Sequence, residues 1–155
     1  PPPILSGLVG SEMCIRDRDG DNIRFGLSAD LGFTPADRTE NIRRIGEVAK
    51  LFADAGVVVI TAFISPYRDD RNRVRTIAPD QFHEVFIKAD LSTCETRDPK
   101  GLYAKARNGE IEDFTGVSAP YEEPTDANLI IDTGVQHIDQ SVSKLIDYVS
   151  LNFKS

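Results

Sequence analysis

The residue types best suited to phosphoryl chemistry are concentrated between residues 19 and 44. Asp19 and Asp21 are separated by one glycine, and two carboxylates at this spacing can hold a metal ion or accept a proton from a hydroxyl. Four arginines follow in the same stretch: Arg24, Arg38, Arg43 and Arg44. Each guanidinium can donate two parallel hydrogen bonds, which suits a planar or multiply charged anion. We therefore expect phosphoryl chemistry on a small anionic substrate.

The composition excludes several classes of function. The chain has 155 residues, 40% hydrophobic and 28% charged, which is enough for one domain with one core. Its net charge of −7 argues against nucleic-acid binding, because the phosphate backbone would repel the protein. No apolar run approaches the ~18 residues of a membrane helix, and residues 1–10 lack the pattern of a signal peptide. We expect a cytoplasmic protein that binds neither nucleic acid nor membranes.

The two cysteines and two histidines do not form a recognisable metal or disulfide pattern. Cys14 and Cys94 are far apart, and His83 and His137 are isolated, so none has the spacing of zinc ligands. We expect structural or incidental roles for the two histidines.

The elements that must position the arginines begin with a helix over residues 35–55. Thr34 can cap this helix, Pro35 suits its first position, and Gly56 can end it. Its apolar face is predicted to contain Ile42, Ile45, Ala49, Phe52 and Ala53. Arg38, Asn41 and Arg44 lie three apart on a different face, which could point several donors at one ligand or could be a solvated charged face.

A strand is expected directly after this helix. Residues 57–60 are an uninterrupted β-branched run, typical of a parallel strand buried on both faces. Ligands of open α/β sheets bind beyond the carboxyl ends of strands, so Ile64 and Ser65 should lie near a ligand. Ser65 could instead cap a helix with Pro66 at its first position, and we favour this over a nucleophile because no partner base is identifiable.

The remaining pattern alternates between strand and helix. Further elements are predicted as a helix over 68–77, a strand over 82–87 with His83 and Glu84 facing outward or toward a sheet end, a helix over 91–97 capped by Asp90, and a strand over 129–131. The closing helix should bury a stripe of Ile138, Val142, Leu145, Ile146, Val149 and Phe153. This order predicts a doubly wound α/β fold.

Residues 98–124 break the pattern with repeated glycines and prolines. A long irregular segment in a compact domain is usually a functional loop or lid, although it can also be disordered. We favour the lid.

Residues 1–18 read as a leader outside the domain that occupies residues 19–155. They show little periodicity, although 13–15 could form a short strand, and the glycines at 7 and 10 are not followed by the lysine of a phosphate loop. Residues 6–17 also resemble a translated sequencing adaptor. We interpret the leader as an artefact that has replaced a lost N-terminal portion.

Several motifs in order resemble the adenylyl-sulfate kinase family, over residues 19 to about 153. They are Asp19-Gly20-Asp21-Asn22-Ile23-Arg24, Leu31-Gly32-Phe33, Ala36-Asp37-Arg38, Glu40-Asn41-Ile42-Arg43-Arg44, Thr61-Ala62-Phe63-Ile64-Ser65-Pro66, Arg97-Asp98-Pro99-Lys100-Gly101-Leu102-Tyr103 and Phe114-Thr115-Gly116. Any one would be weak alone, but together they make a chance match very improbable.

The resemblance implies an enzyme that transfers the γ-phosphoryl group of ATP to the 3′-hydroxyl of adenosine 5′-phosphosulfate, with Mg²⁺, in sulfate assimilation. It implies a P-loop kinase-like three-layer α/β sandwich with a mostly parallel sheet. It also implies a homodimer, with a sulfurylase acting in the same pathway.

The resemblance also implies roles for particular residues. Asp21 would orient or deprotonate the accepting hydroxyl, Asp19 would organise magnesium, and Arg97 would lie near the ATP base. Phe33 and Phe114 would sandwich the substrate adenine. Further substrate contacts would come from Asn22, Ile23, Arg24, Arg38, Asn41, Ile42, Arg43, Arg44, Ile64, Ser65, Lys100 and Thr115. Ser65 is described in the family as a phosphoserine intermediate, but direct in-line transfer needs no protein nucleophile, so we expect it to aid binding or turnover instead.

The sequence departs from the family at its start. The strand and the G-x-x-x-x-G-K-S/T phosphate loop that precede the Asp-Gly-Asp motif in such kinases are missing. That strand is normally central, so we expect the sheet to collapse, to borrow the leader as a substitute strand, or to keep a gap. Two readings follow: an adenylyl-sulfate kinase by descent that is inactive and poorly stable as this chain, or a non-catalytic nucleotide-sulfate binding or dimerisation module.

Overall fold

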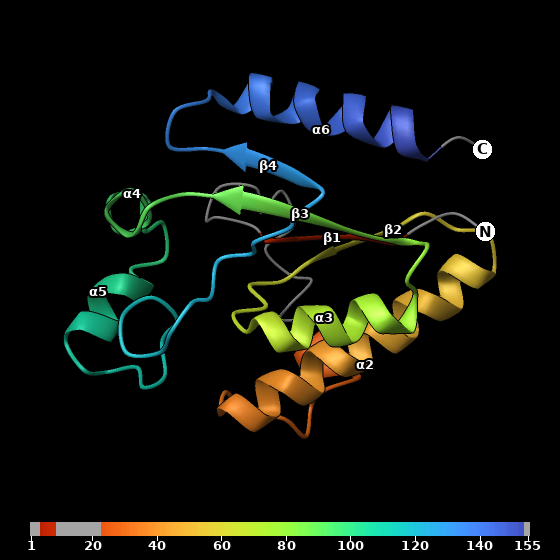
Figure 1. The fold of residues 1–155 in the computed structure, drawn as a ribbon. Coiled ribbons are helices and arrows are strands. Elements are labelled where there is room, and N and C mark those ends of the chain that lie inside the picture. The colour runs from red at the N-terminus through yellow and green to blue at the C-terminus, as the bar shows by residue number, and fades with distance from the viewer. Residues whose placement is uncertain (1–3, 9–22, 154–155) are drawn as a thin grey trace.

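The computed structural model describes residues 4–8 and 23–153, and Figure 1 gives their arrangement. Its strands are β1 (Ile4–Leu8), β2 (Val59–Ala62), β3 (Phe82–Lys88) and β4 (Leu129–Asp132). Its helices are α2 (Pro35–Asp54), α3 (Arg68–Ile77), α4 (Leu91–Arg97), α5 (Leu102–Arg107) and α6 (Ile138–Asn152). No helix within these residues is both long and apolar enough to span a bilayer.

The described strands form one parallel sheet in the order β2-β1-β3-β4. β1 comes from the segment predicted to be a leader, and it lies between β2 and β3, with Leu5 opposite Ile60 on one side and His83 on the other. Of the three outcomes expected for the sheet, the borrowed strand is the one observed. β1 pairs with a parallel neighbour on each side, and it supplies partners to backbone groups of β2 and β3 that a gap would have left unpaired.

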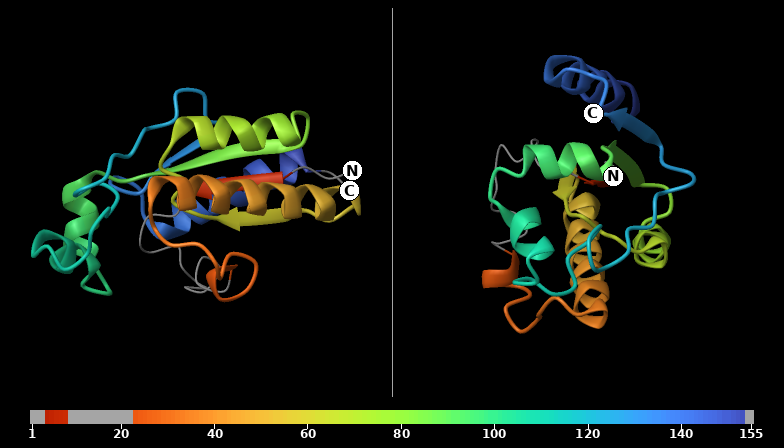
Figure 2. Two further views of the ribbon diagram at one scale, coloured as in Figure 1. Left: turned by 90° about the horizontal axis from the view of Figure 1, so that it is seen from below. Right: turned by 90° about the vertical axis from the view of Figure 1, so that its left-hand side faces the viewer.

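The sheet is the middle of three layers. α2 and α3 cover one face, and α6 packs on the other face beside β4 (Figures 1 and 2). One core cluster joins α2 residues such as Ile45 and Ala49 to Val74 of α3 and to Phe82. A second joins Val85, Ile87 and Ile131 to one side of α6. The predicted α/β sandwich is confirmed.

α2 begins and ends where local signals predicted. The Thr34 hydroxyl accepts a hydrogen bond from the Asp37 amide at 3.2 Å, Pro35 opens the helix, and Gly56 follows it with a φ of 90°. Two assignments of face were wrong. Phe52 is 54% exposed although it was placed on the buried face, and Asn41 is 5% exposed although it was placed with the charged residues.

β2 is an edge strand of the described sheet, not the strand buried on both faces that its β-branched run predicted. Ile60 is 64% exposed for this reason. Ser65 does not cap α3, because that helix begins at Arg68 and its N-cap is Tyr67. The second error arises because the chain continues past Ser65 for two more residues before α3 starts.

The predictions for the later elements were mostly confirmed. The bounds of α3 and α4 match, and Asp90 caps α4 by accepting from the Thr93 amide at 2.7 Å. Glu84 was expected to face outward or toward a sheet end, but it is 3% exposed and is neutralised by arginines of α3. In α6, Ile138 and Ile146 are more than half exposed, so the buried stripe is narrower than predicted.

The segment 98–124 is not wholly irregular, since it contains α5. After α5 it forms turns stabilised by hydrogen bonds, including the Phe114 amide to the Ser118 hydroxyl at 2.9 Å. The arrowheads of β3 and β4 point toward α4 and α5 (Figure 1). The helix α5 and its loops therefore lie near the carboxyl edge of the sheet, where α/β proteins bind ligands.

Candidate substrate site

An exposed aromatic ring with two arginines close to it forms the centre of the site. Phe33 precedes α2 and is 60% exposed, and the guanidinium carbons of Arg24 and Arg38 lie 4.2 Å and 5.9 Å from its ring centroid. Arg24 Nη1 donates to the carbonyl of Gly32 at 2.6 Å, and Arg38 Nε donates to the carbonyl of Phe33 at 2.9 Å. We call Arg24, Phe33 and Arg38 the Phe33 cluster. It offers a flat ring for stacking and two cations for an anion.

Arg38 also joins this cluster to the segment after α5. Its Nη2 donates to the carbonyl of Asp113 at 2.8 Å, and Asp113 has a φ of 52°, in the left-handed region. The next residue, Phe114, packs edge-on against Tyr103 with centroids 5.0 Å apart. Arg38 thus connects the backbone of Phe33 with the backbone next to Phe114, the two residues predicted to bind the adenine.

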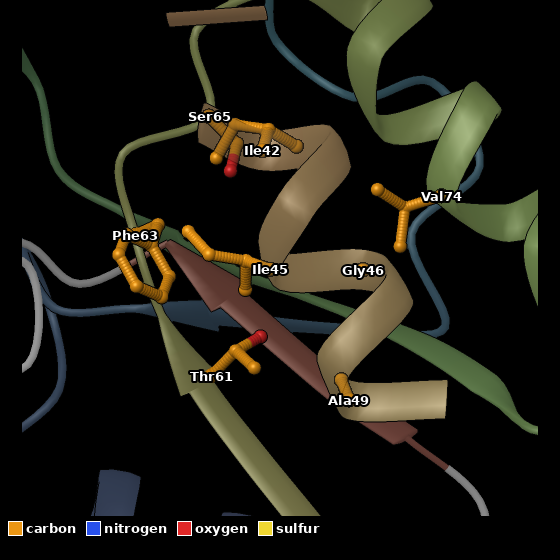
Figure 3. Close-up of a pocket in the computed structure, with 8 residues that line it drawn as sticks. All are labelled: Ile42, Ile45, Gly46, Ala49, Thr61, Phe63, Ser65 and Val74. Carbon is orange, nitrogen blue, oxygen red and sulfur yellow. The ribbon is translucent and has the colours of Figure 1, made fainter. Parts of the chain in front are cut away.

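A small pocket lies between α2 and the segment after β2. Its lining includes Ile42, Ile45, Phe63 and Ser65, which Figure 3 shows on facing elements. Ser65 is 6% exposed and has a φ of 42°, while neighbouring Ile64 is half exposed. This places the predicted residues Ile42 and Ser65 together, at the amino-terminal half of α2.

Two of the buried polar atoms that lack a hydrogen-bond partner in the described part of the chain lie beside the candidate site. They are Asn41 Oδ1, on α2 beside Ile42, and Thr115 Oγ1, next to Phe114. Buried polar groups are normally hydrogen-bonded, so orphaned acceptors or hydroxyls next to a candidate site are open to a ligand or water.

Arg43 and Arg44 use their donors within the protein. Arg43 pairs with Glu40 at 2.8 Å, while Arg44 pairs with Glu40 at 2.9 Å and Asp30 at 2.6 Å. Hydrogen bonds from Arg43 and then Arg44 lower the pKa of Glu40 to about 2. Arg44 likewise lowers the pKa of Asp30. The positive charge of these two arginines is therefore largely compensated within the protein, whereas the sequence had suggested that it was available to an anionic substrate.

Arg97 and Lys100 lie on and just after α4. Arg97 donates to the backbone carbonyl of Thr133 at 2.7 Å and to its hydroxyl at 3.2 Å, and so fastens α4 to the loop that follows β4. Lys100 is exposed in the link to α5. The structure does not bring Arg97 into the Phe33 cluster.

Asp19, Asp21 and Asn22 lie outside the described residues, and the side chain of Ile23 packs against the α2 core. Within the described residues no group of three or more His, Cys, Asp or Glu side chains could hold a metal ion. The predicted magnesium role of Asp19 therefore stays a prediction.

Sequence reasoning missed a buried ionic cluster of Arg71, Arg75 and Glu84. Arg71 and Glu84 side chains are each 4% exposed, and Nε of Arg71 lies 2.7 Å from Oε1 of Glu84. From the sequence, α3 was predicted as a helix, with no partner assigned to its charged residues. A glutamate within an apolar strand, after arginines spaced four apart on a helix, was the signal that could have indicated the pair.

Comparison with known proteins identifies relatives over most of the chain. A model of the family described as adenylylsulphate kinase matches residues 6–132, beginning within the segment predicted to be a leader. The chain is 60% identical over 132 residues to the adenylyl-sulfate kinase of Bacillus licheniformis, covering 84% of this chain and 67% of that one. It is 63% identical over 129 residues to that of Prochlorococcus marinus, covering 83% and 64%. The chain thus spans about two thirds of the length of these relatives.

Solved structures agree. The APS kinase CysC of Mycobacterium tuberculosis, in complex with AMPPNP and APS, superposes with a TM-score of 0.77 at 40% identity, covering 96% of this chain and 80% of that one. A gluconokinase from Sinorhizobium meliloti, at 20% identity and a TM-score of 0.55, shares the fold alone. On the family match, the identities and the sheet order together, this chain belongs to the adenylyl-sulfate kinase family of phosphotransferases, and its fold is that of these P-loop kinases.

Proposed function

We propose that this chain is the acceptor-substrate part of an adenylyl-sulfate kinase and binds adenosine 5′-phosphosulfate at the Phe33 cluster. The observation that carries the proposal is an exposed phenyl ring with guanidinium groups 4.2 Å and 5.9 Å from its centre. An adenine can stack on such a ring, and the arginines match the charges of a phosphosulfate. The complex of a 40% identical relative with APS and AMPPNP supports the same ligand.

Neighbouring residues extend the proposed site. Arg38 holds the backbone before Phe114, so this second ring is proposed to enclose the base from the segment after α5. The unpartnered Asn41 Oδ1 and Thr115 Oγ1 are proposed to accept or donate hydrogen bonds to the bound nucleotide. Further contacts are proposed for Asn22, Ile23, Ile42, Arg43, Arg44, Ile64, Ser65 and Lys100.

In the family reaction ATP supplies the phosphoryl group that the substrate's 3′-hydroxyl accepts. We propose Asp21 as the group that orients this hydroxyl and Arg97 as a neighbour of the ATP base. The described residues contain no cluster of three candidate metal ligands, and the sequence contains no Gly-Lys-Ser/Thr phosphate loop. We therefore derive no step through ATP or magnesium for this chain.

The second candidate is a module that binds the nucleotide without turning it over, which the missing phosphate-loop lysine favours. Calorimetry with adenosine 5′-phosphosulfate, beside a coupled assay of ADP release, separates the two. We expect saturable binding without ADP release from the 155-residue chain. Turnover would show that other residues replace the phosphate loop, and an absence of binding would refute the proposed site.

The proposal includes a homodimer in the cytoplasm, with a sulfurylase supplying the substrate. Sedimentation of the purified chain across a range of concentrations tests the dimer: one monomeric species throughout would contradict it.

A further inference from the structure

Arg71 of α3 is a buried arginine that bonds three separate segments at once. Its Nη1 donates to the carbonyl of Ser65 at 2.7 Å, and its Nη2 donates to the carbonyl of Glu122 at 2.7 Å. Its Nε forms the 2.7 Å ion pair with Glu84 of β3. Only 4% of its side chain is exposed, so the two hydrogen bonds and the ion pair all lie away from bulk water, where electrostatic interactions are strong.

The first of these segments is a strained turn. Ser65 has a φ of 42°, in the left-handed region that residues other than glycine enter at a cost. Its side chain is among those lining the pocket with Ile42 and Phe63 (Figure 3). Such a conformation persists only where its surroundings enforce it, and Arg71 holds the carbonyl of this very residue.

The second segment, residues 121–123, is fastened to the same turn at several points. The Glu122 amide donates to the carbonyl of Pro66 at 2.9 Å, and the Arg68 amide donates to Oε2 of Glu122 at 2.7 Å. Arg68 Nη2 donates to the carbonyl of Glu123 at 3.0 Å. The preceding Tyr121 ring stacks on Phe86 of β3 with centroids 6.2 Å apart.

Residues 121–123 end the chain segment that carries Phe114. Just before Phe114, the carbonyl of Asp113 accepts a hydrogen bond from Arg38 of the Phe33 cluster. After Phe114, the carbonyl of Glu122 accepts a hydrogen bond from Arg71. A displacement of residues 121–123 would therefore shift both the Ser65 turn and the residues that lead back to Phe114.

We propose that Arg71 is a positioning residue that couples the Ser65 turn to the segment 108–124, so that the two sides of the substrate site take up their binding geometry together. The inference rests on the proposed function for its ligand. It assigns no contact with substrate to Arg71, which acts through the two backbone carbonyls that it holds.

The test compares Arg71→Lys with a matched control, Arg75→Lys. Lysine keeps the charge opposite Glu84 but cannot present a planar fork to two carbonyls and a carboxylate at once. Arg75 lies one turn along the same helix and binds the other Glu84 oxygen at 2.7 Å, but its further partner is Asp126 instead of the Ser65 turn. A general effect of weakening the buried ionic cluster would appear in both variants.

Two measurements are made on the full 155-residue chain. Calorimetry with adenosine 5′-phosphosulfate should show affinity about tenfold weaker in Arg71→Lys, equivalent to about 1.4 kcal/mol, and within about twofold of the parent in Arg75→Lys. Amide hydrogen exchange without ligand should be faster by about tenfold in Arg71→Lys, at both 63–67 and 119–124. Unchanged affinity, equal losses in the two variants, or faster exchange spread evenly over α2 and β3 would overturn the proposal.

The exchange arm separates this inference from the proposed function. If the parent chain does not bind the nucleotide, the proposed function fails. Faster amide exchange of Arg71→Lys at both 63–67 and 119–124 would still support the coupling. Faster exchange in only one of these two segments would overturn it. The double variant Ser65→Gly with Arg71→Lys gives a second check, because glycine adopts positive φ without the steric cost. It should restore slow exchange at 63–67 but not at 119–124; no restoration would contradict the role assigned to the strained turn.

Discussion

The Phe33 ring gives the sharpest prediction about binding. Replacing it with alanine removes the surface on which the adenine is proposed to stack and the ring over which Arg24 lies 4.2 Å away. It leaves the hydrogen bonds of Arg24 and Arg38 to the backbone carbonyls of Gly32 and Phe33 in place. Phe33→Ala should therefore affect the ligand far more than the fold.

The magnitudes follow from exposure. A fully buried phenylalanine side chain contributes about 1.5–3 kcal/mol, and Phe33 is 60% exposed, so its burial contributes about 1 kcal/mol to the free energy of unfolding. The exposed contact with Arg24 adds about 0.5–1 kcal/mol. Stacking of one base on an aromatic side chain contributes about 1–3 kcal/mol, so affinity should fall by roughly 5-fold to 150-fold.

The assay is calorimetry with adenosine 5′-phosphosulfate, combined with a urea titration of each variant. Phe25→Ala is the matched control, because Phe25 is 86% exposed, is not a member of the Phe33 cluster and has no predicted contact with the base. We expect the control to bind as the parent does. If Phe33→Ala also binds like the parent, the stacking role is refuted.

Three further predictions concern stability. Glu84→Gln should lower the free energy of unfolding by about 3–5 kcal/mol, because it leaves the buried Arg71 without its counter-charge; a loss below about 1 kcal/mol in urea titrations would contradict a desolvated pair. Gly46→Ala places a Cβ 3.0 Å from a methyl of Val74 and should cost about 1–3 kcal/mol between α2 and α3, whereas a raised melting temperature would show that the helices can separate. Burial lowers the pKa of His83 below its usual 6.5, so the unfolded chain takes up the proton first and stability should fall as pH drops below 6.5. Thermal melts from pH 8 to 5 should show a smaller fall in His83→Gln, and an equal fall would rule out this histidine as the source.

Elements with strong local signals could be predicted from the sequence. Thr34, Pro35 and Gly56 determine where α2 begins and ends through cap and turn chemistry that involves only nearby residues. The same holds for α4, whose first turn is capped by Asp90. Such interactions lie within a few residues of each other, so no knowledge of the tertiary structure is needed.

Elements that depend on neighbours could not be predicted. β1 has five residues without clear periodicity. It forms a strand because β2 and β3 pair with its backbone on either side. The β-branched run around Ile60 suggested a buried strand, but its position at the sheet edge leaves that residue exposed. Strand burial is a property of the whole sheet, which a single run of residues does not encode.

The candidate site shows the same division. The residue types around Phe33 indicated an aromatic and arginine-rich pocket, and the structure brings Arg24 and Arg38 to that ring. The sequence could not tell that Glu40 would occupy Arg43 and Arg44, since carboxylates and arginines on one helix can pair or face a ligand. It also could not reveal that Arg71 would donate to the carbonyls of both Ser65 and Glu122, which are more than fifty residues apart in the chain.

A crystal structure of this chain with adenosine 5′-phosphosulfate tests the central claim most directly. We expect the adenine to stack on the Phe33 ring, with Arg24 moved off that face and the phosphosulfate within hydrogen-bond distance of Arg24 or Arg38. A nucleotide bound elsewhere on the chain, with the Phe33 ring still covered by Arg24, would contradict it.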